Sequence, residues 1–416
     1  MADKKVLTVS LLSSGRIDTI ERCLSSLTPL REGLDTEVIV VDTDAGHDPK
    51  VRQIVERFAD KIIDFEWCND FSAARNVGMS AASGEWFFYL DDDEWLIDSQ
   101  ALIDFLRLAD GGNPSWVNLL VRNYFNDELS EFSDAWVTRL VRIQNGIRFV
   151  GRVHEYFDPL SGKPKAIMSV LGHTGYIFHS KEALDAHLKR NISLLEEAIK
   201  ENPLELRFRH QLLQEYEASG NVEGQKRLCD DALSLLSKTK DVRLDPMRGL
   251  FFAAKLRIFR NAGDSGRELR FFEKNKRLLK HCGTVAGAYI SLEAATLYVN
   301  SDDYEKAGSY VLSYMESYYK NKDDDSLISV QGLYFLADTY SNEMYSLACK
   351  MQREILIKRL ENAKDSNSNA YDVEIAAERK LLYSQIMEKI EFLEKAGRNE
   401  DAHRMRAQLL KAMEGR

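Results

Sequence analysis

The chain has 416 residues, 44% of them hydrophobic, and a formal net charge of −10. This acidic balance argues against a general nucleic-acid-binding protein, which normally carries a basic face. No segment reaches the about 18 consecutive apolar residues of a membrane span, and no basic-then-apolar signal opens the chain. The five cysteines are far apart and form no C-x-x-C pair, which is typical of reduced thiols, so we expect a cytoplasmic protein.

In the first half of the chain, apolar runs alternate with amphipathic segments. The apolar runs predict strands at 5–12, 37–43, 61–67 and 85–91, with further strands at 116–125 and 136–143. Helical spacing of apolar residues predicts intervening helices at 17–27, 49–59 and 72–82. Strands that are apolar almost throughout are typical of a parallel α/β sheet with both faces covered.

From about residue 182 the pattern changes to pairs of amphipathic helices. A helix, a Gly-Asn turn and a second helix are predicted over 202–236, and the same plan recurs at 287–318 and 383–413. A helix–turn–helix unit of roughly 34 residues resembles the tetratricopeptide repeat, and an irregular helical domain is the alternative. We therefore divide the chain into an α/β domain at 1–181 and an α-helical repeat domain at 182–416.

Polar side chains follow three of the predicted strands. Asp42 ends the second strand, Arg75 lies in the helix after the third, and four adjacent acids at 91–94 follow the fourth. Each has a simple structural explanation, as a turn or cap residue, an exposed helix charge, or a solvated loop. In an open α/β sheet, however, ligands bind at the carboxyl ends of the strands, where all three features fall.

A divalent cation fits these residue types. Mg²⁺ and Mn²⁺ prefer carboxylate oxygens and bridge substrate phosphates with few protein ligands. Alternate residues of an extended segment point the same way, so we expect Asp91 and Asp93 to face one pocket, and Asp92 and Glu94 to face away. Arg75 could then bind phosphate through its planar guanidinium.

The segments "VSLLSSGRIDTIERCLSSL", "EVIVVDTD", "WCNDFSAARNVGMSAASGEWFFYLDDDEW" and "FVGRVHEYF" together resemble family 2 of the glycosyltransferases, over about residues 5–180. The resemblance implies the nucleotide-diphosphosugar-binding GT-A fold, with a mixed, mainly parallel sheet, and metal-dependent transfer that inverts the anomeric centre. It implies that Asp42 contacts the uracil or ribose and that Arg75 lies near the diphosphate. Asp91 would contact nucleotide and metal, and Asp93 would be the principal metal ligand. The implied nucleotide-binding set comprises Ser10, Leu12, Asp42, Arg75, Asp91 and Asp92.

Two histidine-containing segments extend the resemblance. In "GRVHEYF", Glu155 is the implied general base, and His154 is a metal ligand or an orienting residue; a structural His-Glu pair is the alternative. In "GHTGYIFH", His173 is a candidate metal or diphosphate ligand, whereas His179 is more typical of a structural residue at a strand end. Where the family often has an Asn-Glu pair this chain has "SSGR", so the resemblance assigns no role to Arg16.

The helical half suggests a large acceptor. Helical repeats present extended surfaces for polypeptides or for a homodimer. The chain is similar to bacteriocin-peptide S-glycosyltransferases and flagellin O-glycosyltransferases, which implies transfer of glucose or N-acetylglucosamine from a UDP-sugar to Ser, Thr or Cys of a peptide or protein. One alternative is an enzyme acting on a lipid-linked or polysaccharide acceptor in envelope synthesis. Another is a non-catalytic scaffold with a relic first domain.

Overall fold

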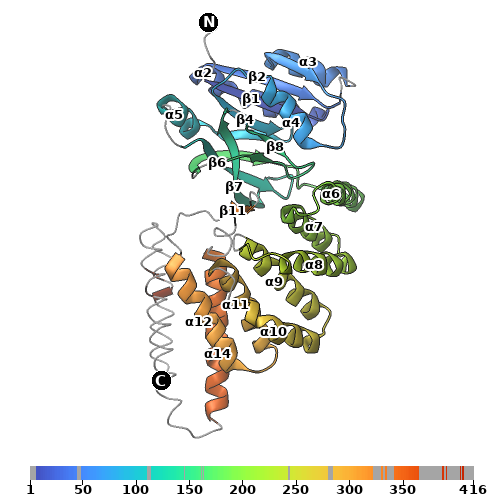
Figure 1. Cartoon of the computed structure of the whole chain (residues 1–416). Coiled ribbons are helices and arrows are strands. Elements are labelled where there is room, and N and C mark those ends of the chain that lie inside the picture. Colours follow the sequence, from blue (N-terminus) through green and yellow to red (C-terminus); the bar gives the residue numbers. More distant parts are fainter. Residues whose placement is uncertain are drawn as a thin grey trace. The chain divides into compact units, whose positions relative to one another are not determined.

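The computed structural model describes residues 6–44, 48–109, 114–144, 146–160, 162, 164–241, 244–279, 284–321, 329–330, 333–334 and 342–364, with 387, 390, 403, 405 and 406. The chain forms two compact units (Figure 1). The first comprises Met1–Ala232 with Gln331–Leu333, and the second comprises Leu233–Val330 with Tyr334–Arg416.

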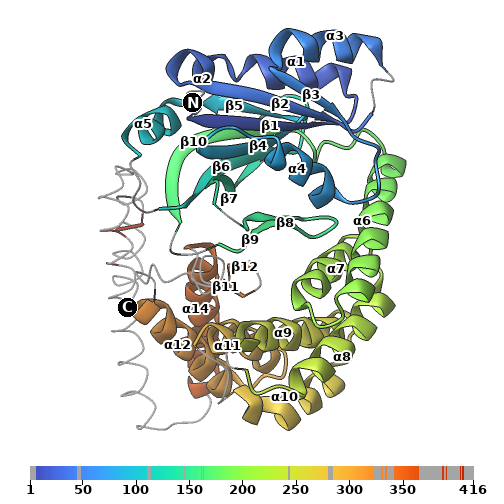
Figure 2. The ribbon, with the colours of Figure 1, turned by 45° about the horizontal axis from the view of Figure 1, so that its top comes forward.

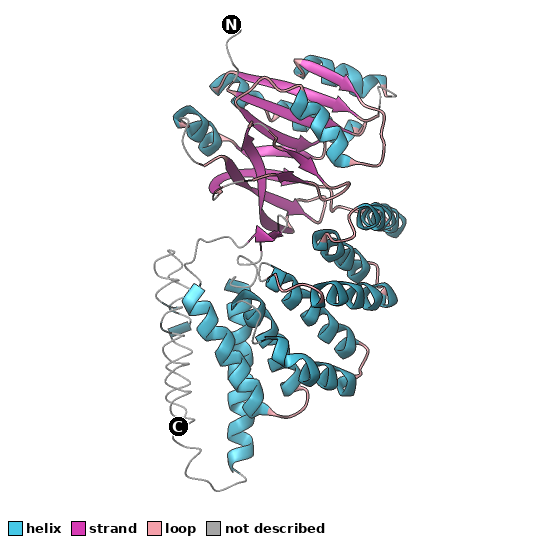
Figure 3. Cartoon of the chain, viewed as in Figure 1, coloured by secondary structure: helices cyan, strands magenta, loops and turns pink. Residues whose placement is uncertain are grey.

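The first unit is built on an eight-stranded sheet of order β3-β2-β1-β4-β7-β6-β10-β5 (Figure 3). The strands β3, β2, β1 and β4 are parallel, β6 and β10 are parallel, and the remaining pairs are antiparallel. The mixed, mainly parallel sheet is therefore confirmed. Its strands are β1 (Leu7–Ser13), β2 (Thr36–Asp42), β3 (Lys61–Asp64), β4 (Trp86–Asp91), β5 (Glu94–Asp98), β6 (Trp116–Tyr124), β7 (Phe132–Arg142) and β10 (Lys165–His173), and a separate hairpin pairs β8 (Arg148–Val150) with β9 (Tyr156–Asp158).

Helices cover both faces of this sheet (Figure 2). Side chains alternate along β1, so Leu7, Val9 and Leu11 enter the main core while Leu12 faces the other side. The main core is closed by α1 (Ile17–Ser25), α2 (Thr28–Gly33), α3 (Pro49–Phe58) and α5 (Gln100–Leu108). On the opposite face, α4 (Phe71–Ser80) buries Leu12 against Ala74. Each fully buried Leu or Val contributes roughly 1.5–3 kcal/mol.

Helix α4 approaches the sheet unusually closely. A Cβ at Gly78 would lie 2.2 Å from Ser10 Oγ, so a larger residue at this position would require Ser10 to move. The helix is capped by Asp70, whose carboxylate accepts a hydrogen bond from Ala73 N at 3.0 Å. This cap and this contact hold Arg75, in the middle of α4, near the carboxyl ends of β1 and β4.

The strands and helices predicted in the first 90 residues are all present, with small shifts at their ends. The predicted helix 17–27 continues after a break as α2, where Thr28–Pro29 starts a new turn, and β3 ends at Asp64 rather than at 67. Elements of this unit that were not predicted include α2, β5, α5, β8, β9 and β10. Both β5 and β10 mix apolar and polar residues, because each is only partly buried, so neither stands out as an apolar run.

Three helices follow the sheet: α6 (Lys181–Glu201), α7 (Leu206–Ala218) and α8 (Val222–Ser237). Helices α7 and α8 match the pair predicted at 202–236, and Gly220 adopts a positive φ of 69° in the turn between them. Val153, from the loop after β8, is buried among Leu194 of α6 and Phe208 and Leu212 of α7. A hydrophobic core therefore joins helices α6 and α7 to the loop after β8, within the first unit.

The second unit is helical, with a core rich in tyrosine that includes Tyr298, Tyr314 and Tyr345. Its helices α11 and α12 match the pair predicted at 287–318, whereas the pair predicted at 383–413 lies outside the described residues except for five positions. Its helices are α9 (Asp245–Asn261), α10 (Ser265–Leu279), α11 (Thr284–Val299), α12 (Tyr304–Asn321) and α14 (Asn342–Lys364). In the sequence between α12 and α14, the two-residue strands β11 (Ser329–Val330) and β12 (Leu333–Tyr334) pair with each other.

Within the described ranges, no helix combines the length and the hydrophobicity needed to cross a bilayer. The four cysteines whose positions are described are free thiols.

Candidate functional site

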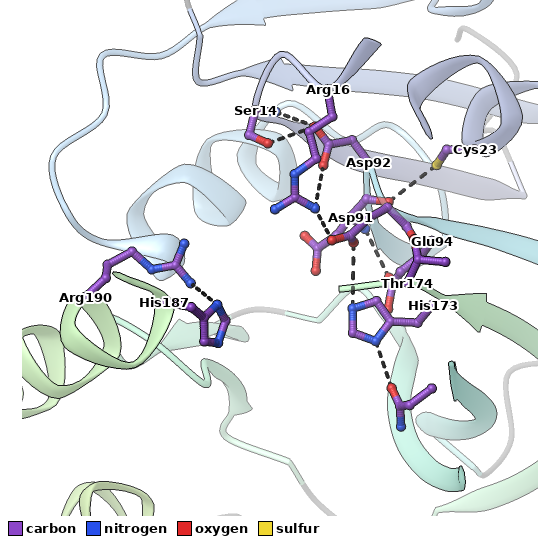
Figure 4. A network of polar contacts seen from close by, with 12 residues as sticks. Ser14, Arg16, Cys23, Asp91, Asp92, Glu94, His173, Thr174, His187 and Arg190 are labelled. Atoms are coloured by element: carbon purple, nitrogen blue, oxygen red, sulfur yellow. Dashed lines mark hydrogen bonds and ion pairs between the residues drawn. The ribbon is translucent and has the colours of Figure 1, made fainter. Parts of the chain in front are cut away.

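The four adjacent acids form a tight turn at the carboxyl edge of the parallel strands (Figure 4). Asp91 ends β4, residues 92 and 93 form the turn, and Glu94 begins β5. We call residues 91–94 the acidic turn. Asp92, Asp93 and Glu94 are only 3%, 7% and 1% exposed, which excludes the solvated-loop explanation. Because the segment turns, the alternation expected for an extended chain does not apply, and each carboxylate has its own surroundings.

Three arginines from separate elements neutralise the acidic turn. Arg16, after β1, contacts Asp93 and lies 3.5 Å from Asp92. Arg75 of α4 pairs with Asp91, and Arg139 of β7 pairs with Glu94. None of these cations is close to the turn in sequence, so the charge balance depends on the tertiary fold.

Asp91 and Arg75 form an ion pair with two hydrogen bonds. Arg75 Nη2 donates to both carboxylate oxygens of Asp91, at 2.8 and 3.0 Å, and its Nε donates to Glu155. Burial opposes the charge of Arg75, but Asp91 and Glu155 outweigh it and raise the pKa of the guanidinium. Burial likewise opposes the charge of Asp91, and Arg75 outweighs it and lowers the pKa of the carboxyl. The Nη1 atom of Arg75 is buried and has no hydrogen-bond partner.

Asp92 binds the backbone after β1 rather than facing away unpartnered. Its Oδ2 accepts from Ser14 N at 2.6 Å and from Ser14 Oγ at 3.0 Å. Burial raises the pKa of Asp92 to about 6, although Arg16 and Ser14 oppose the rise. Asp92 thus ties the loop after β1 to the acidic turn.

Glu94 does not face away, as the sequence pattern suggested, but is the most buried residue of the acidic turn. One of its oxygens contacts Arg139, and Oε2 accepts from Asp91 N at 3.0 Å, so the side chain closes the turn. Burial raises the pKa of Glu94, and Arg139 opposes that rise. The expectation failed because the partner, Arg139, lies 45 residues away on another strand.

Asp93 faces His173, which ends β10. The Nδ1 atom of His173 lies 2.7 Å from Asn123 Oδ1, so Nδ1–H donates to Asn123 and Nε2 carries the lone pair. That Nε2 lies 3.7 Å from Asp93 Oδ1, a buried oxygen with no hydrogen-bond partner. Burial lowers the pKa of His173, which favours the neutral imidazole that binds metals. Thr174 N and Oγ1 both donate to Asp93 O at 3.2 Å and fix the main chain.

Gly175 keeps space open beside this pair. A Cβ at this position would lie 2.3 Å from His173 Nε2 and 3.0 Å from Asp93 Oδ2. The backbone of Gly175 does not have a positive φ, so the need for glycine is one of space. Within the described residues no group of three or more His, Cys, Asp or Glu side chains is arranged to hold a metal, so Asp93 and His173 form a two-ligand site at most.

The predicted nucleotide side lies on the neighbouring strands. In the sheet register Ser13 pairs with Asp42 and Leu12 pairs with Asp91, which places Asp42 two strands from the acidic turn. Asp42 is buried and accepts from Arg52 Nη1 at 3.2 Å and from Asp44 N at 3.1 Å. The side chains of Ser10 and Leu12 are buried beneath α4, and their backbone lies in β1 between β2 and β4.

His154 and Glu155 lie in the loop between β8 and β9. Glu155 is held by Arg75, as described above. His154 Nε2 instead lies 3.3 Å from Glu215 Oε1 on α7, so the structure brings His154 to the helical side rather than to Asp93. Sequence reasoning missed Glu215, Asn123 and Arg139; each lies in an ordinary helix or strand pattern with no local motif to mark it.

A mixed α/β sheet that carries its acidic turn and arginines at the carboxyl edge of the parallel strands, followed by an all-α region, is a GT-A fold with a helical extension. Residues 13–161 match the family model Glycosyl transferase family 2, and this part of the chain is a domain of that family.

Two curated relatives match parts of the chain. The SPbeta prophage-derived glycosyltransferase SunS of Bacillus subtilis (strain 168) is 27% identical over 217 residues, which cover 50% of this chain and 49% of SunS. The TPR repeat-containing protein Synpcc7942_0270 of Synechococcus elongatus is 34% identical over 91 residues, or 22% of this chain and 21% of that protein. The chain thus spans half or less of the length of these relatives.

Among solved structures, S. aureus TarS 1-349 in complex with UDP-GlcNAc aligns with a TM-score of 0.37 and 15% identity. The alignment covers 76% of this chain and 92% of that one. A likeness at so low a TM-score supports no conclusion about the function of this chain.

Proposed function

We propose that the protein transfers glucose or N-acetylglucosamine from a UDP-sugar to a Ser, Thr or Cys side chain of a peptide or protein, with a divalent metal and inversion at the anomeric carbon. The family 2 domain at 13–161 supports the reaction class. The observation that carries the proposal is the Asp93–His173 pair, with its unpartnered buried oxygen and the space beside Gly175.

The metal assignment rests on the chemistry of this pair. A carboxylate and a neutral imidazole, the latter fixed by Asn123, are ligands that Mn²⁺ accepts. Two protein ligands leave positions for diphosphate oxygens and water, as is usual for Mg²⁺ and Mn²⁺ sites. A bound metal supplies positive charge to the departing diphosphate.

Arg75 is proposed to bind the diphosphate beside the metal. Its Nη2 and Nε atoms are held by Asp91 and Glu155, while the buried Nη1 has no partner in the structure. An unpartnered buried donor is costly, and a phosphate oxygen would satisfy it. Asp42, at the end of β2, is proposed to receive the uridine.

The acceptor side is assigned to the loop that carries His154 and Glu155. In an inverting transfer the acceptor oxygen or sulfur attacks the anomeric carbon from the face opposite the diphosphate, and the diphosphate leaves with the bonding electron pair. A hydroxyl acceptor needs a base to take its proton. A polypeptide acceptor is favoured because paired helices continue through the second unit.

The proposal is tested by incubating the full chain with UDP-glucose or UDP-N-acetylglucosamine, Mn²⁺ and a pooled synthetic peptide library. Each peptide carries one Ser, Thr or Cys, and mass spectrometry detects the addition of one sugar. We expect transfer with Mn²⁺ and none with EDTA, and NMR of the product should show an anomer opposite to that of the donor. A protein that neither binds UDP nor hydrolyses or transfers either sugar would refute the proposed function.

A further inference from the structure

His154 is held in a backbone conformation that L-residues rarely adopt. Its φ is +52°, and Gly151, earlier in the same loop, has a φ of +104° and lies beside Phe208 of α7. A positive φ costs about 1–2 kcal/mol for a residue other than glycine, so neighbouring contacts must compensate. One of them is Arg207 of α7, whose Nη2 donates to the His154 carbonyl at 3.2 Å. The fold therefore holds His154 in an unfavourable backbone conformation, and this conformation fixes the position of the imidazole.

The imidazole is oriented by a buried carboxylate. His154 Nε2 lies 3.3 Å from Glu215 Oε1, and Asn191 Nδ2 of α6 donates to the same oxygen at 3.0 Å. The side chain of Glu215 is 11% exposed, whereas that of His154 is 40% exposed. Burial opposes the charge of Glu215, but the hydrogen bonds from His154 and Asn191 outweigh it and lower its pKa. A buried carboxylate that holds one nitrogen of an accessible imidazole leaves the other nitrogen free to take a proton.

His154 is adjacent in the chain to Glu155, whose carboxylate is paired with Arg75, and Arg75 also pairs with Asp91 of the acidic turn. Figure 4 shows Arg190 and His187 of α6 on the side toward Arg16. Burial lowers the pKa of both Arg190 and His187, and the charge of Arg16 lowers both further. The ring of Tyr176 packs edge-on against that of His173, with 5.2 Å between the ring centroids.

We infer that His154 is the base that takes the acceptor proton, with Glu215 as the residue that positions it; the inference rests on the proposed function. As the acceptor oxygen forms its bond to the anomeric carbon, its proton moves to His154 Nδ1, and the bond from the anomeric carbon to the diphosphate breaks. Nε2–H remains on Glu215, whose negative charge balances the imidazolium. The imidazolium then loses its proton to water.

Glu155 has a different proposed role from that of His154. Its carboxylate is bonded to Arg75 and its side chain is only 10% exposed, so it is both engaged and less accessible than His154. Because Arg75 also binds Asp91, Glu155 acts as a positioning residue for the donor side. The two adjacent residues therefore serve opposite sides of the reaction.

The division of roles is tested with a matched pair of peptides, one with Ser and one with Cys at the acceptor position, taken from the peptide library. A hydroxyl needs a base, whereas a thiol with a pKa near 8.5 already yields some thiolate at neutral pH. We expect His154→Asn, which tolerates the positive φ, to lower serine transfer about 10²–10⁴-fold and cysteine transfer much less. Glu215→Gln should show the same serine-selective loss, and Glu155→Gln should lower both transfers alike. His179→Asn is the matched control, because His179 pairs with Asp127 at 3.6 Å on the exposed surface.

Chemical rescue gives a second readout that a structural role would not produce. His154→Gly keeps the backbone conformation and removes the ring, so added imidazole should restore part of the serine transfer. Three results would each overturn the inference. His154→Asn could lower serine and cysteine transfer equally, or Glu155→Gln could show the serine-selective loss instead. In the third, added imidazole does not restore serine transfer in His154→Gly. If His154→Gly does not fold, the Asn variant and Glu215→Gln make the same comparison. A wild-type chain that transfers to neither peptide contradicts the proposed function and this inference with it.

Discussion

The buried pair of Glu94 and Arg139 offers the sharpest test of how the acidic turn is held. Their side chains are 1% and 9% exposed, and Glu94 also accepts the Asp91 N–H. Arg139→Met removes the cation and leaves Glu94 as a buried carboxylate without its counter-ion. Breaking a buried pair in this way costs about 3–5 kcal/mol. We therefore expect the free energy of unfolding of the first unit to fall by about that amount.

A double variant measures the interaction energy between Glu94 and Arg139 separately from the effect of each residue alone. Adding Glu94→Gln to Arg139→Met removes the stranded charge and keeps an oxygen that accepts from Asp91 N. Much of the lost stability should return, with a coupling energy of about 0.5–3 kcal/mol in the double-mutant cycle. Arg122→Met is the control, because Arg122 pairs with Asp134 at 2.8 Å on neighbouring strands but both are about one-third exposed. An exposed pair of this kind is worth at most about 1 kcal/mol.

The five tryptophans provide the assay. All of them lie between Trp67 and Trp136, so tryptophan fluorescence reports on the sheet of the first unit alone. Urea unfolding of the four chains of the cycle, followed by this signal, yields the free energies. A loss below about 1 kcal/mol for Arg139→Met, or additive effects in the double variant, would refute the reasoning that the pair is a coupled buried ion pair.

Further predictions concern the metal site, the domain boundary and acid stability. Asp93→Ala should abolish Mn²⁺ binding and sugar transfer, while the urea midpoint of unfolding stays near that of the wild type. Unchanged transfer would refute the assignment of Asp93 as a metal ligand. Gly175→Ala should weaken Mn²⁺ binding, measured by calorimetry, because the new Cβ enters the space beside the ligand pair; unaltered binding would place the metal elsewhere. A chain ending at residue 201 lacks α7, and we expect it to lose both the folding of the sheet unit and UDP binding. A chain ending at residue 237 should keep UDP binding and lose peptide transfer. Full peptide transfer by this second chain would exclude the second unit from acceptor recognition. Because the folded-state pKa of Glu215 lies below its ordinary value of 4.5, its stabilising effect is full above that pH and is lost as pH falls through the folded pKa. The stability difference between wild type and Glu215→Gln should therefore shrink below pH 4.5, and a constant difference down to about pH 3 would contradict this linkage.

Much of the sheet could be predicted because its central strands are buried on both faces. β1, β2 and β4 are buried at nearly every position and are rich in apolar residues, and this pattern needs no knowledge of their neighbours. The strand-end polar residues could be predicted for a related reason, since the end of an apolar run marks the edge where ligands bind. Partly buried strands such as β5 and β10 have no such pattern, because their burial is decided by elements distant in sequence.

The partners of the site residues could not be predicted. Asn123 fixes His173, Arg139 neutralises Glu94 and Glu215 orients His154, each across 45 or more residues. Nothing in "LVRNYF" or "VTRLVRI" distinguishes these residues from ordinary polar positions of strands. A contact between remote positions is a property of the fold, and a single sequence does not reveal it.

The arrangement of partners also explains how a chain can bury so much negative charge in one turn. Asp91 and Glu94 have guanidinium partners, and Asp92 has the backbone and hydroxyl of Ser14. Only Asp93 keeps a buried oxygen without a hydrogen bond, and that oxygen faces His173 Nε2. The fold therefore satisfies every carboxylate of the acidic turn except the one oxygen at which a cation is proposed to bind. If Asp93 were only another structural acid, replacing it with Asn should leave Mn²⁺ binding unchanged, whereas a metal ligand at this position requires that binding be lost.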